Sequence, residues 1–159
     1  ICIPKDKKKT FFLHKNKIKN KIKIIYTVKK SQVYQRIQGF KNARGKYVLQ
    51  LDDDIKLDSN CLKNLLVAIK KYKKAAVSPI LLNSNKKQAS SFDKRPKNIF
   101  FKIYHFFLNG KNGYISGKVS KAGIPYNFDF LNKNKSFQEV EWLPGGCILH
   151  NKKNLLKKN

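Results

Sequence analysis

Short apolar runs alternate with helical patterns through the first half of the chain, and this alternation constrains the fold more than any other feature. The runs "IKIIYTV" (residues 22–28), "KYVLQL" (46–51) and "AAVSPILL" (75–82) are rich in branched apolar residues, as buried strands are. A helical pattern separates each run from the next. Strands and helices in this order form βαβ units, so we expect an α/β fold with a mainly parallel sheet flanked by helices.

The expected helices between these strands each have an N-cap residue and an apolar face. Ser31 precedes the first helix, and Asp58 precedes the second, which runs to Tyr72. In the second half we expect an aromatic helix over residues 97–110 and a last helix from Lys152. The inward faces predicted from helical spacing are Val33, Ile37, Phe40 and Ala43 in the first helix and Leu62, Leu65, Leu66 and Ile69 in the second.

The chain is strongly basic, with 36 lysines and arginines against 9 acidic residues and a formal net charge of +27. Such a charge favours phosphate-bearing substrates, polyanions and anionic lipid surfaces. A basic nucleic-acid-binding module is therefore an alternative function. It is disfavoured because Arg36, Arg44 and Arg95 are the only arginines, and because no zinc-finger, RRM or KH signature is found in the sequence.

The cysteines, Cys2, Cys61 and Cys147, are odd in number and have no CxxC spacing. We interpret them as free thiols in a reducing compartment, without a cysteine-type metal site. No apolar run reaches the ~18 residues of a membrane span, and the lysine-rich start lacks the apolar core of a signal peptide. These observations predict a cytoplasmic protein.

The aromatic segment 100–108 has two interpretations. Lys97, Lys102 and Lys111 lie around it. The segment can cover the sheet, which we favour as the commoner role of an apolar helix. It can instead lie against an anionic membrane, which would place the protein at the inner face of that membrane.

Asp52, Asp53 and Asp54 directly follow the strand at 46–51, at the end of the strand where parallel sheets bind ligands. In an extended backbone Asp52 and Asp54 point one way and Asp53 the other. Two converging carboxylates suit Mn²⁺ or Mg²⁺, with a substrate diphosphate completing the shell. The alternative is an exposed acidic turn. We favour the metal site, because adjacent like charges at a strand end are costly without a partner.

A metal ion on a diphosphate stabilises the charge that builds as the diphosphate leaves, which suits group transfer from a nucleotide-activated donor. A phosphatase of the D-x-D-x-T type is a weaker alternative, because Lys56 stands where that pattern has threonine.

Two stretches of the chain resemble family 2 glycosyltransferases. The stretch "SQVYQRIQGFKNARGKYVLQLDDDIKLDSNCLKNL" resembles the family's central segment, where a helix with "QRN-x-G", a glycine before a strand, and "LDDD" or "D-x-D" follow in this order. The stretch "EVEWLPGGCILHNKKNLL" is similar to the family's "W-x-x-G-G" segment ahead of a helix. The resemblance covers residues 31–159 and implies a GT-A fold, a nucleoside-diphosphate sugar as donor, and a glycan or lipid-linked acceptor.

The resemblance also assigns roles to residues. Asp52 and Asp54 match the D-x-D pair, with Asp54 as the direct metal ligand and Asp52 nearer the ribose and the metal. Donor contacts are implied for the acidic triplet and for the "QR" of the helix, and sugar or acceptor contacts for the "W-x-x-G-G" segment. By number, the donor residues are Gln35, Arg36, Asp52, Asp53 and Asp54, and the acceptor-side residues are Trp142, Gly145 and Gly146. The glycines would let sugars approach the backbone, whereas Trp142 has core packing as an equal alternative.

The sequence departs from the family pattern at several points. Ile37 replaces the asparagine that usually follows "QR", and no base-gripping strand or "DDGS"-like segment is visible before Ile22. No "ED" pair follows the glycines, so we expect the general base beyond Asn159 and an inactive fragment. Glu139 and Glu141 could replace that base, but two exposed acids balancing lysines are the favoured interpretation.

We therefore expect residues 1–159 to form a single, truncated GT-A domain. It comprises a lysine-rich irregular segment (1–21), a βαβαβ nucleotide and metal half (22–83) and an acceptor-side half (84–159). The absence of methionine and the isoleucine at position 1 support the expectation of a fragment.

Overall fold

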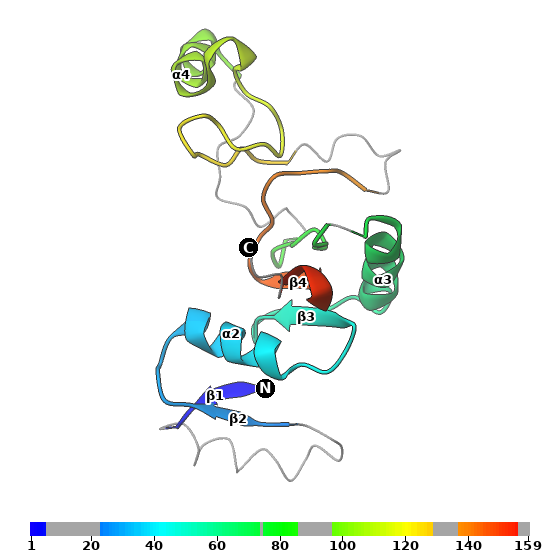
Figure 1. Ribbon diagram of the computed structural model, residues 1–159. Coiled ribbons are helices and arrows are strands. Elements are labelled where there is room, and N and C mark those ends of the chain that lie inside the picture. The colour runs from blue at the N-terminus through cyan, green and yellow to red at the C-terminus, as the bar shows by residue number, and fades with distance from the viewer. Residues whose placement is uncertain (6–22, 74, 86–96, 129–136, 156–159) are drawn as a thin grey trace.

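The computed structural model describes residues 1–5, 23–73, 75–85, 97–128 and 137–155. Helices and strands alternate in its first part, and its second part is dominated by one helix and long loops (Figure 1). The elements are β1 (Cys2–Pro4), β2 (Ile25–Thr27), α2 (Gln32–Asn42), β3 (Tyr47–Leu51), α3 (Cys61–Lys71), α4 (Ile99–Asn109), the 3-10 helix η2 (Gly110–Asn112), β4 (Cys147–Asn151) and α5 (Lys152–Leu155).

The strands form two small sheets rather than the expected mainly parallel one. β1 pairs with β2 in parallel, and β3 pairs with β4 in antiparallel register, with Tyr47 opposite Asn151 and Leu51 opposite Cys147. Val77 makes an antiparallel bridge to Leu149. β4 thus lies between β3 and the segment around Val77. These two segments run in the same direction, but each pairs with β4 and not with the other. The predicted mainly parallel sheet is therefore not confirmed in the described residues, because a strand from the far end of the chain is inserted between these two segments.

The hydrophobic core lies between α3 and the β3–β4 sheet. Leu65 and Ile69 of α3 meet Cys147 and Leu149, which alternate along β4 and so share one face of the sheet. Partly buried apolar side chains surround this group: Tyr47, Leu49, Ile55, Leu57, Cys61, Leu66, Val77 and Leu81. The expected helix face is confirmed for Leu65 and Ile69, whereas Leu62 is exposed.

The first predicted helix forms as α2, and Ser31 caps it as expected by accepting a hydrogen bond from the Tyr34 backbone N–H. Its predicted inward face is wrong in part, because Val33 and Ile37 are exposed. α2 lies beside β1 and β2 (Figure 1). These are short strands, so they cover little of the helix.

Other local predictions need smaller corrections. Asn60, not Asp58, is the N-cap of α3; the Asp58 carboxylate instead accepts a hydrogen bond from the Asn60 N–H at 3.0 Å. The run 75–82 forms no continuous strand, and only Val77 of it bridges to β4. The segment 1–21, expected to be irregular, contains β1, and its residues 6–21 lie outside the described part of the chain.

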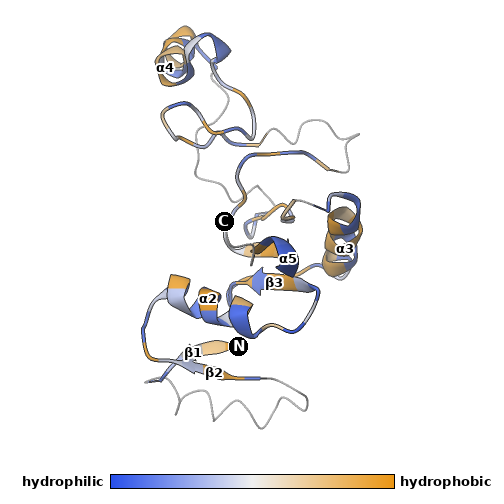
Figure 2. Ribbon diagram, in the orientation of Figure 1, coloured by the Kyte–Doolittle hydropathy of each residue, from blue (hydrophilic) through white to orange (hydrophobic). Residues whose placement is uncertain are grey.

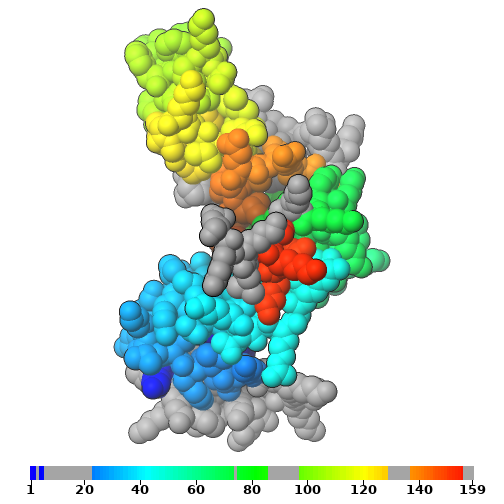
Figure 3. Space-filling model, viewed as in Figure 1, coloured from blue at the N-terminus to red at the C-terminus, as the bar shows by residue number. Residues whose placement is uncertain are grey.

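The aromatic helix forms as α4. Asn98 caps its start by accepting a hydrogen bond from the Phe101 N–H at 3.1 Å, and Gly110 ends it at φ 64°, a conformation that glycine adopts without strain. α4 packs on η2 and the loop that follows, and these residues form one end of the molecule (Figure 3). The favoured expectation that this helix covers the sheet is therefore wrong.

Candidate functional site

The acidic triplet follows β3 directly, and the backbone there is tied to the glycine pair. The Asp52 N–H donates to the carbonyl oxygen of Gly146 at 2.8 Å, which continues the β3–β4 pairing by one step. The chain then turns at Asp53 and Asp54. The extended backbone that would place Asp52 and Asp54 on one face is therefore not formed, and alternation of strand faces does not decide where Asp54 points.

An ion pair connects this strand end to α2. The Arg36 Nη2 lies 2.6 Å from the Asp52 Oδ1, with the two side chains 28% and 30% exposed. Such a charge-assisted hydrogen bond holds the carboxylate in one orientation. Arg36 is available for this because α2 presents it toward the sheet from the middle of the helix.

The glycine pair lies against the same ion pair. A Cβ at Gly145 would lie 3.8 Å from the Arg36 Nη1, and one at Gly146 would lie 3.7 Å from the Asp52 Oδ2 and only 2.6 Å from the Ile55 Cδ1. Glycine at 146 thus permits the close approach of the two strand ends. The structure therefore brings together Arg36, Asp52, Gly145 and Gly146, which we call the Arg36–Asp52–glycine junction.

Gln50 is a part of this junction that the sequence analysis missed. Its side-chain amide donates to the carbonyl oxygen of Gly145. An amide side chain within the apolar and aromatic run 47–51 was the available signal, since a half-buried amide needs a hydrogen-bond partner.

The remaining predicted donor residues are less constrained. Asp53 and Asp54 are exposed, and neither forms an ion pair with another described residue. Gln35 is half-buried next to Arg36 on α2. These residues are sequence neighbours of Arg36 and Asp52, and their roles stay predictions.

Trp142 lies in a separate aromatic contact. Its ring stacks on Phe128 at a centroid distance of 4.3 Å and an interplanar angle of 20°, and its Nε1–H donates to the carbonyl oxygen of Tyr126 at 2.9 Å. One face of the indole is therefore occupied by protein, as the packing alternative expects.

A divalent cation at the acidic triplet would depend on its substrate for ligands. The carboxylates of Asp52 and Asp54 are the hard oxygen donors that Mg²⁺ and Mn²⁺ prefer. However, the described residues contain no group of three or more histidine, cysteine, aspartate or glutamate side chains able to hold a metal. The donor atoms suit the ion, but their number suits a metal that arrives with a diphosphate.

The contacts of the Glu141 carboxylate give this residue a structural role. Its carboxylate accepts a hydrogen bond from the Val119 N–H at 2.8 Å and lies 3.1 Å from the Lys118 Nζ. The backbone hydrogen bond, followed by the lysine, lowers the pKa of Glu141 below its usual value. A carboxylate with a lowered pKa is a weaker base, so the interpretation of Glu141 as an acid that balances a lysine is supported.

The cysteines are free thiols, as predicted. Burial raises the pKa of Cys61, with a further contribution from the charge of Asp58. Burial also raises the pKa of Cys147, helped by Cys61 and Asp52. A raised pKa disfavours the thiolate, which is the reactive form of cysteine. We therefore interpret Cys61 and Cys147 as packing residues.

Comparison with protein families gives one match. The model of the family "Glycosyl transferase family 2" matches residues 12–153, which is most of the chain. No curated protein and no solved structure matches it. The matched range contains α2, β3, α3 and β4, and with them the whole Arg36–Asp52–glycine junction. The chain therefore belongs to glycosyl transferase family 2.

Proposed function

We propose that this chain takes part in metal-dependent transfer of a sugar from a nucleoside diphosphate to an acceptor, with the Arg36–Asp52–glycine junction as the centre of its donor site. Family membership implies a GT-A α/β fold, glycosyl transfer, a nucleotide-sugar donor and an acceptor. The proposal further includes a glycan or lipid-linked acceptor and a location in the cytoplasm, at the inner face of the membrane.

The observation that carries the proposal is the meeting of separate segments at one carboxylate. Arg36 comes from α2, Asp52 from the end of β3, and Gly145 and Gly146 from the residues just before β4. Their contacts cross sequence separations of 16 and more than 90 residues, so no single local turn explains them. An aspartate that only balances a charge needs a single ion pair. Asp52 is held both through its side chain, by Arg36, and through its backbone, by Gly146.

In this proposal Asp54 is the direct ligand of Mn²⁺ or Mg²⁺, and Asp52 completes the protein's share of the coordination. When bound, the metal ion supplies positive charge that stabilises the leaving diphosphate. The exposed position of Asp53 and Asp54 leaves both open to a ligand from solvent.

The other residues have positioning roles in the proposal. Arg36 orients the Asp52 carboxylate and adds positive charge for the nucleotide's phosphates, with Gln35 beside it on the donor side. Gly145 lets a sugar approach the backbone, since it has no Cβ. The Cβ position of Gly146 is filled by the Ile55 side chain, so this glycine contributes by letting Ile55 pack against the strand end. Trp142 is assigned to the acceptor side in this proposal, next to the glycine pair in the sequence.

Thermal unfolding with uridine or guanosine diphosphate, with and without Mn²⁺, tests this function. We expect an increase in Tm that requires nucleotide and metal together and is lost in Asp52→Asn and Asp54→Asn. Asp58→Asn is the matched control, because it removes an exposed charge near the triplet while asparagine retains the acceptor for the Asn60 N–H.

Two results would reject the proposal. One is an increase in Tm with nucleotide and metal together that is as large in Asp54→Asn as in Asp58→Asn. The other is salt-sensitive binding to arbitrary DNA that is indifferent to Asp54→Asn, together with no response to nucleoside diphosphates, which would favour the nucleic-acid-binding alternative.

A further inference from the structure

Helix α4 directs its polar residues toward the protein. His105 and Asn109 lie one turn apart, and both are buried. The side-chain amide of Asn109 donates to the carbonyl oxygen of Gly113 at 2.7 Å, and its oxygen accepts from the Lys121 N–H at 3.2 Å. The His105 ring meets Tyr126 edge-on at 5.0 Å. The protein-facing side of α4 thus makes polar and aromatic contacts, although the buried Nδ1 of His105 has no hydrogen-bond partner among the described residues.

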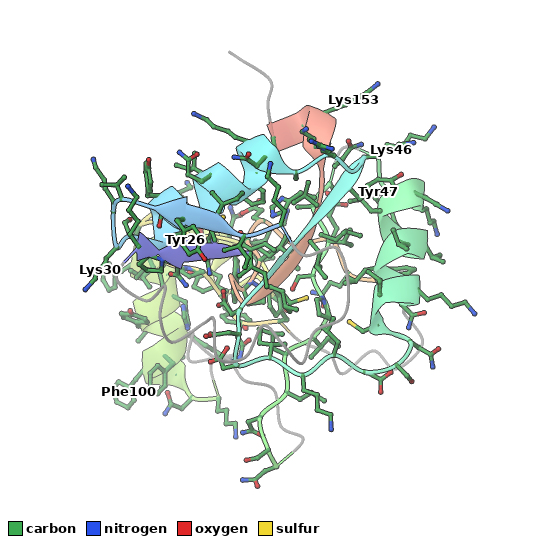
Figure 4. The ribbon with its side chains drawn as sticks, turned by 90° about the horizontal axis from the view of Figure 1, so that it is seen from below. Tyr26, Lys30, Lys46, Tyr47, Phe100 and Lys153 are labelled. Atoms are coloured by element: carbon green, nitrogen blue, oxygen red, sulfur yellow. The ribbon has the colours of Figure 1, made fainter. Side chains whose placement is uncertain are left out.

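The outer side of the helix is almost entirely apolar, the reverse of a usual surface helix. Phe100 is 77% exposed and Phe107 is 81% exposed. Figure 2 shows α4 as mostly hydrophobic, and Figure 4 shows Phe100 at the periphery of the molecule. We call this surface the α4 face; its residues are Ile99, Phe100, Phe101, Ile103, Tyr104, Phe106 and Phe107.

The residues around the α4 face carry positive charge. The sequence from 97 to 128 has five lysines and no acidic residue. Lys118 is paired with Glu141, while Lys97, Lys102, Lys111 and Lys121 are exposed. An apolar face with a basic surround is complementary to the surface of an anionic lipid bilayer, where acyl chains lie below negative headgroups.

The charge also decides between a bilayer and a second copy of the chain. Two copies would each bring a net charge of +27 to the same interface and would repel one another. We therefore propose that the α4 face is a membrane-docking surface. It would insert its phenylalanines between the headgroups and upper acyl chains of the anionic leaflet that it faces.

The length of α4 sets how it would bind. No helix in the described part of the chain is long and apolar enough to cross a bilayer, and α4 has 11 residues where a span needs about 20. The helix would lie in the plane of the interface, with His105 and Asn109 still facing the protein. This proposal does not depend on the donor site.

Vesicle co-flotation of the full chain tests the proposal, with vesicles of phosphatidylcholine alone and of phosphatidylcholine mixed with phosphatidylglycerol. A chain this basic will adhere to anionic vesicles by charge alone, so the informative variant removes apolar area and keeps every charge. We expect Phe100→Ser with Phe107→Ser to weaken partitioning onto the anionic vesicles at least about tenfold.

The matched control is Val33→Ser with Val67→Ser, which removes exposed apolar side chains from α2 and α3 and should leave partitioning unchanged. Asp54→Asn should also bind vesicles normally, so failure here is distinguishable from failure of the donor site. Equal binding of both double variants, or no binding of the unaltered chain to anionic vesicles, would overturn the proposal.

Two further measurements test whether the α4 face is covered by the chain itself or by a second copy of the chain. Urea unfolding of the Phe100→Ser, Phe107→Ser variant should keep the midpoint of the unaltered chain; a lower midpoint would mean that the chain itself covers these rings. Sedimentation should show a monomer, and a dimer that the same variant abolishes would assign the face to a second copy. Either result would replace the membrane as the partner.

Discussion

The β3–β4 region and the α4 region use apolar residues in opposite ways. In the first, Leu65, Ile69, Cys147 and Leu149 are buried between a helix and a sheet, and the charged Arg36–Asp52 pair lies at the edge. In the second, the helix buries His105 and Asn109 and exposes its phenylalanines. The comparison shows that an apolar helix face is not always buried in the protein's own core: α3 buries its apolar side, whereas α4 exposes it.

The largest expected effect comes from shortening a core side chain of α3. Ile69 is 1% exposed, so Ile69→Ala should lower the free energy of unfolding by about 2–5 kcal/mol, through lost burial and a residual cavity. Urea denaturation measures this. Phe107→Ala on α4 should change it by no more than about 0.5 kcal/mol, because its ring already lies in solvent.

Val67→Ala is the matched control for Ile69→Ala, since it lies on the same helix and is 53% exposed. It should behave like Phe107→Ala. If Phe107→Ala destabilised the chain as much as Ile69→Ala, the contrast between the two regions would be lost.

A smaller effect should separate the two glycines of the junction. In Gly146→Ala the new methyl would approach the Ile55 Cδ1 to 2.6 Å, so we expect a loss of about 1–3 kcal/mol as the core readjusts. In Gly145→Ala the nearest atom is the Arg36 Nη1 at 3.8 Å, an ordinary contact, so stability should hold. Thermal or urea unfolding of the pair measures the difference. Equal costs would mean that the close approach at Gly146 does not constrain the strand ends.

The smallest expected effect is a dependence of stability on pH. His150 on β4 packs edge-on against Phe40 at 5.3 Å, and burial lowers its pKa below the ordinary value of 6.5. Between 6.5 and the lowered value the unfolded chain binds more protons than the folded one, so stability should fall as the pH falls through this window. His150→Gln and His150→Phe, which do not titrate, should reduce this loss in urea unfolding at a series of pH values. A slope unchanged in both variants would show that β4 does not keep this ring from water.

Local sequence patterns predicted most elements correctly. Spacing and capping residues indicated α2, α3 and α4, and apolar runs indicated β2 and β3. The faces of the helices were predicted less well, as Val33, Ile37 and Leu62 show. Periodicity identifies an apolar side, but how much of it is covered depends on the size of the neighbouring sheet.

The candidate site was predictable in its residues and not in its contacts. The types and order of Arg36, Asp52, Gly145 and Gly146 pointed to a donor and acceptor site, and their roles stay predictions. The contact of Arg36 with Asp52 and the turn at Asp53–Asp54 were not predictable, because they depend on how α2 is placed against the end of β3.

By itself, the sequence determined the chain's family, its helical and strand segments, and its large positive charge. These follow from composition, periodicity and short motifs, all of which act over neighbouring residues. Only the tertiary structure decided that β4 inserts between β3 and the segment around Val77, that Arg36 and the Gly146 carbonyl hold Asp52, and that α4 turns its aromatic side outward. The reason is physical: pairing and burial are decided between residues far apart in sequence, where several arrangements satisfy the same local pattern.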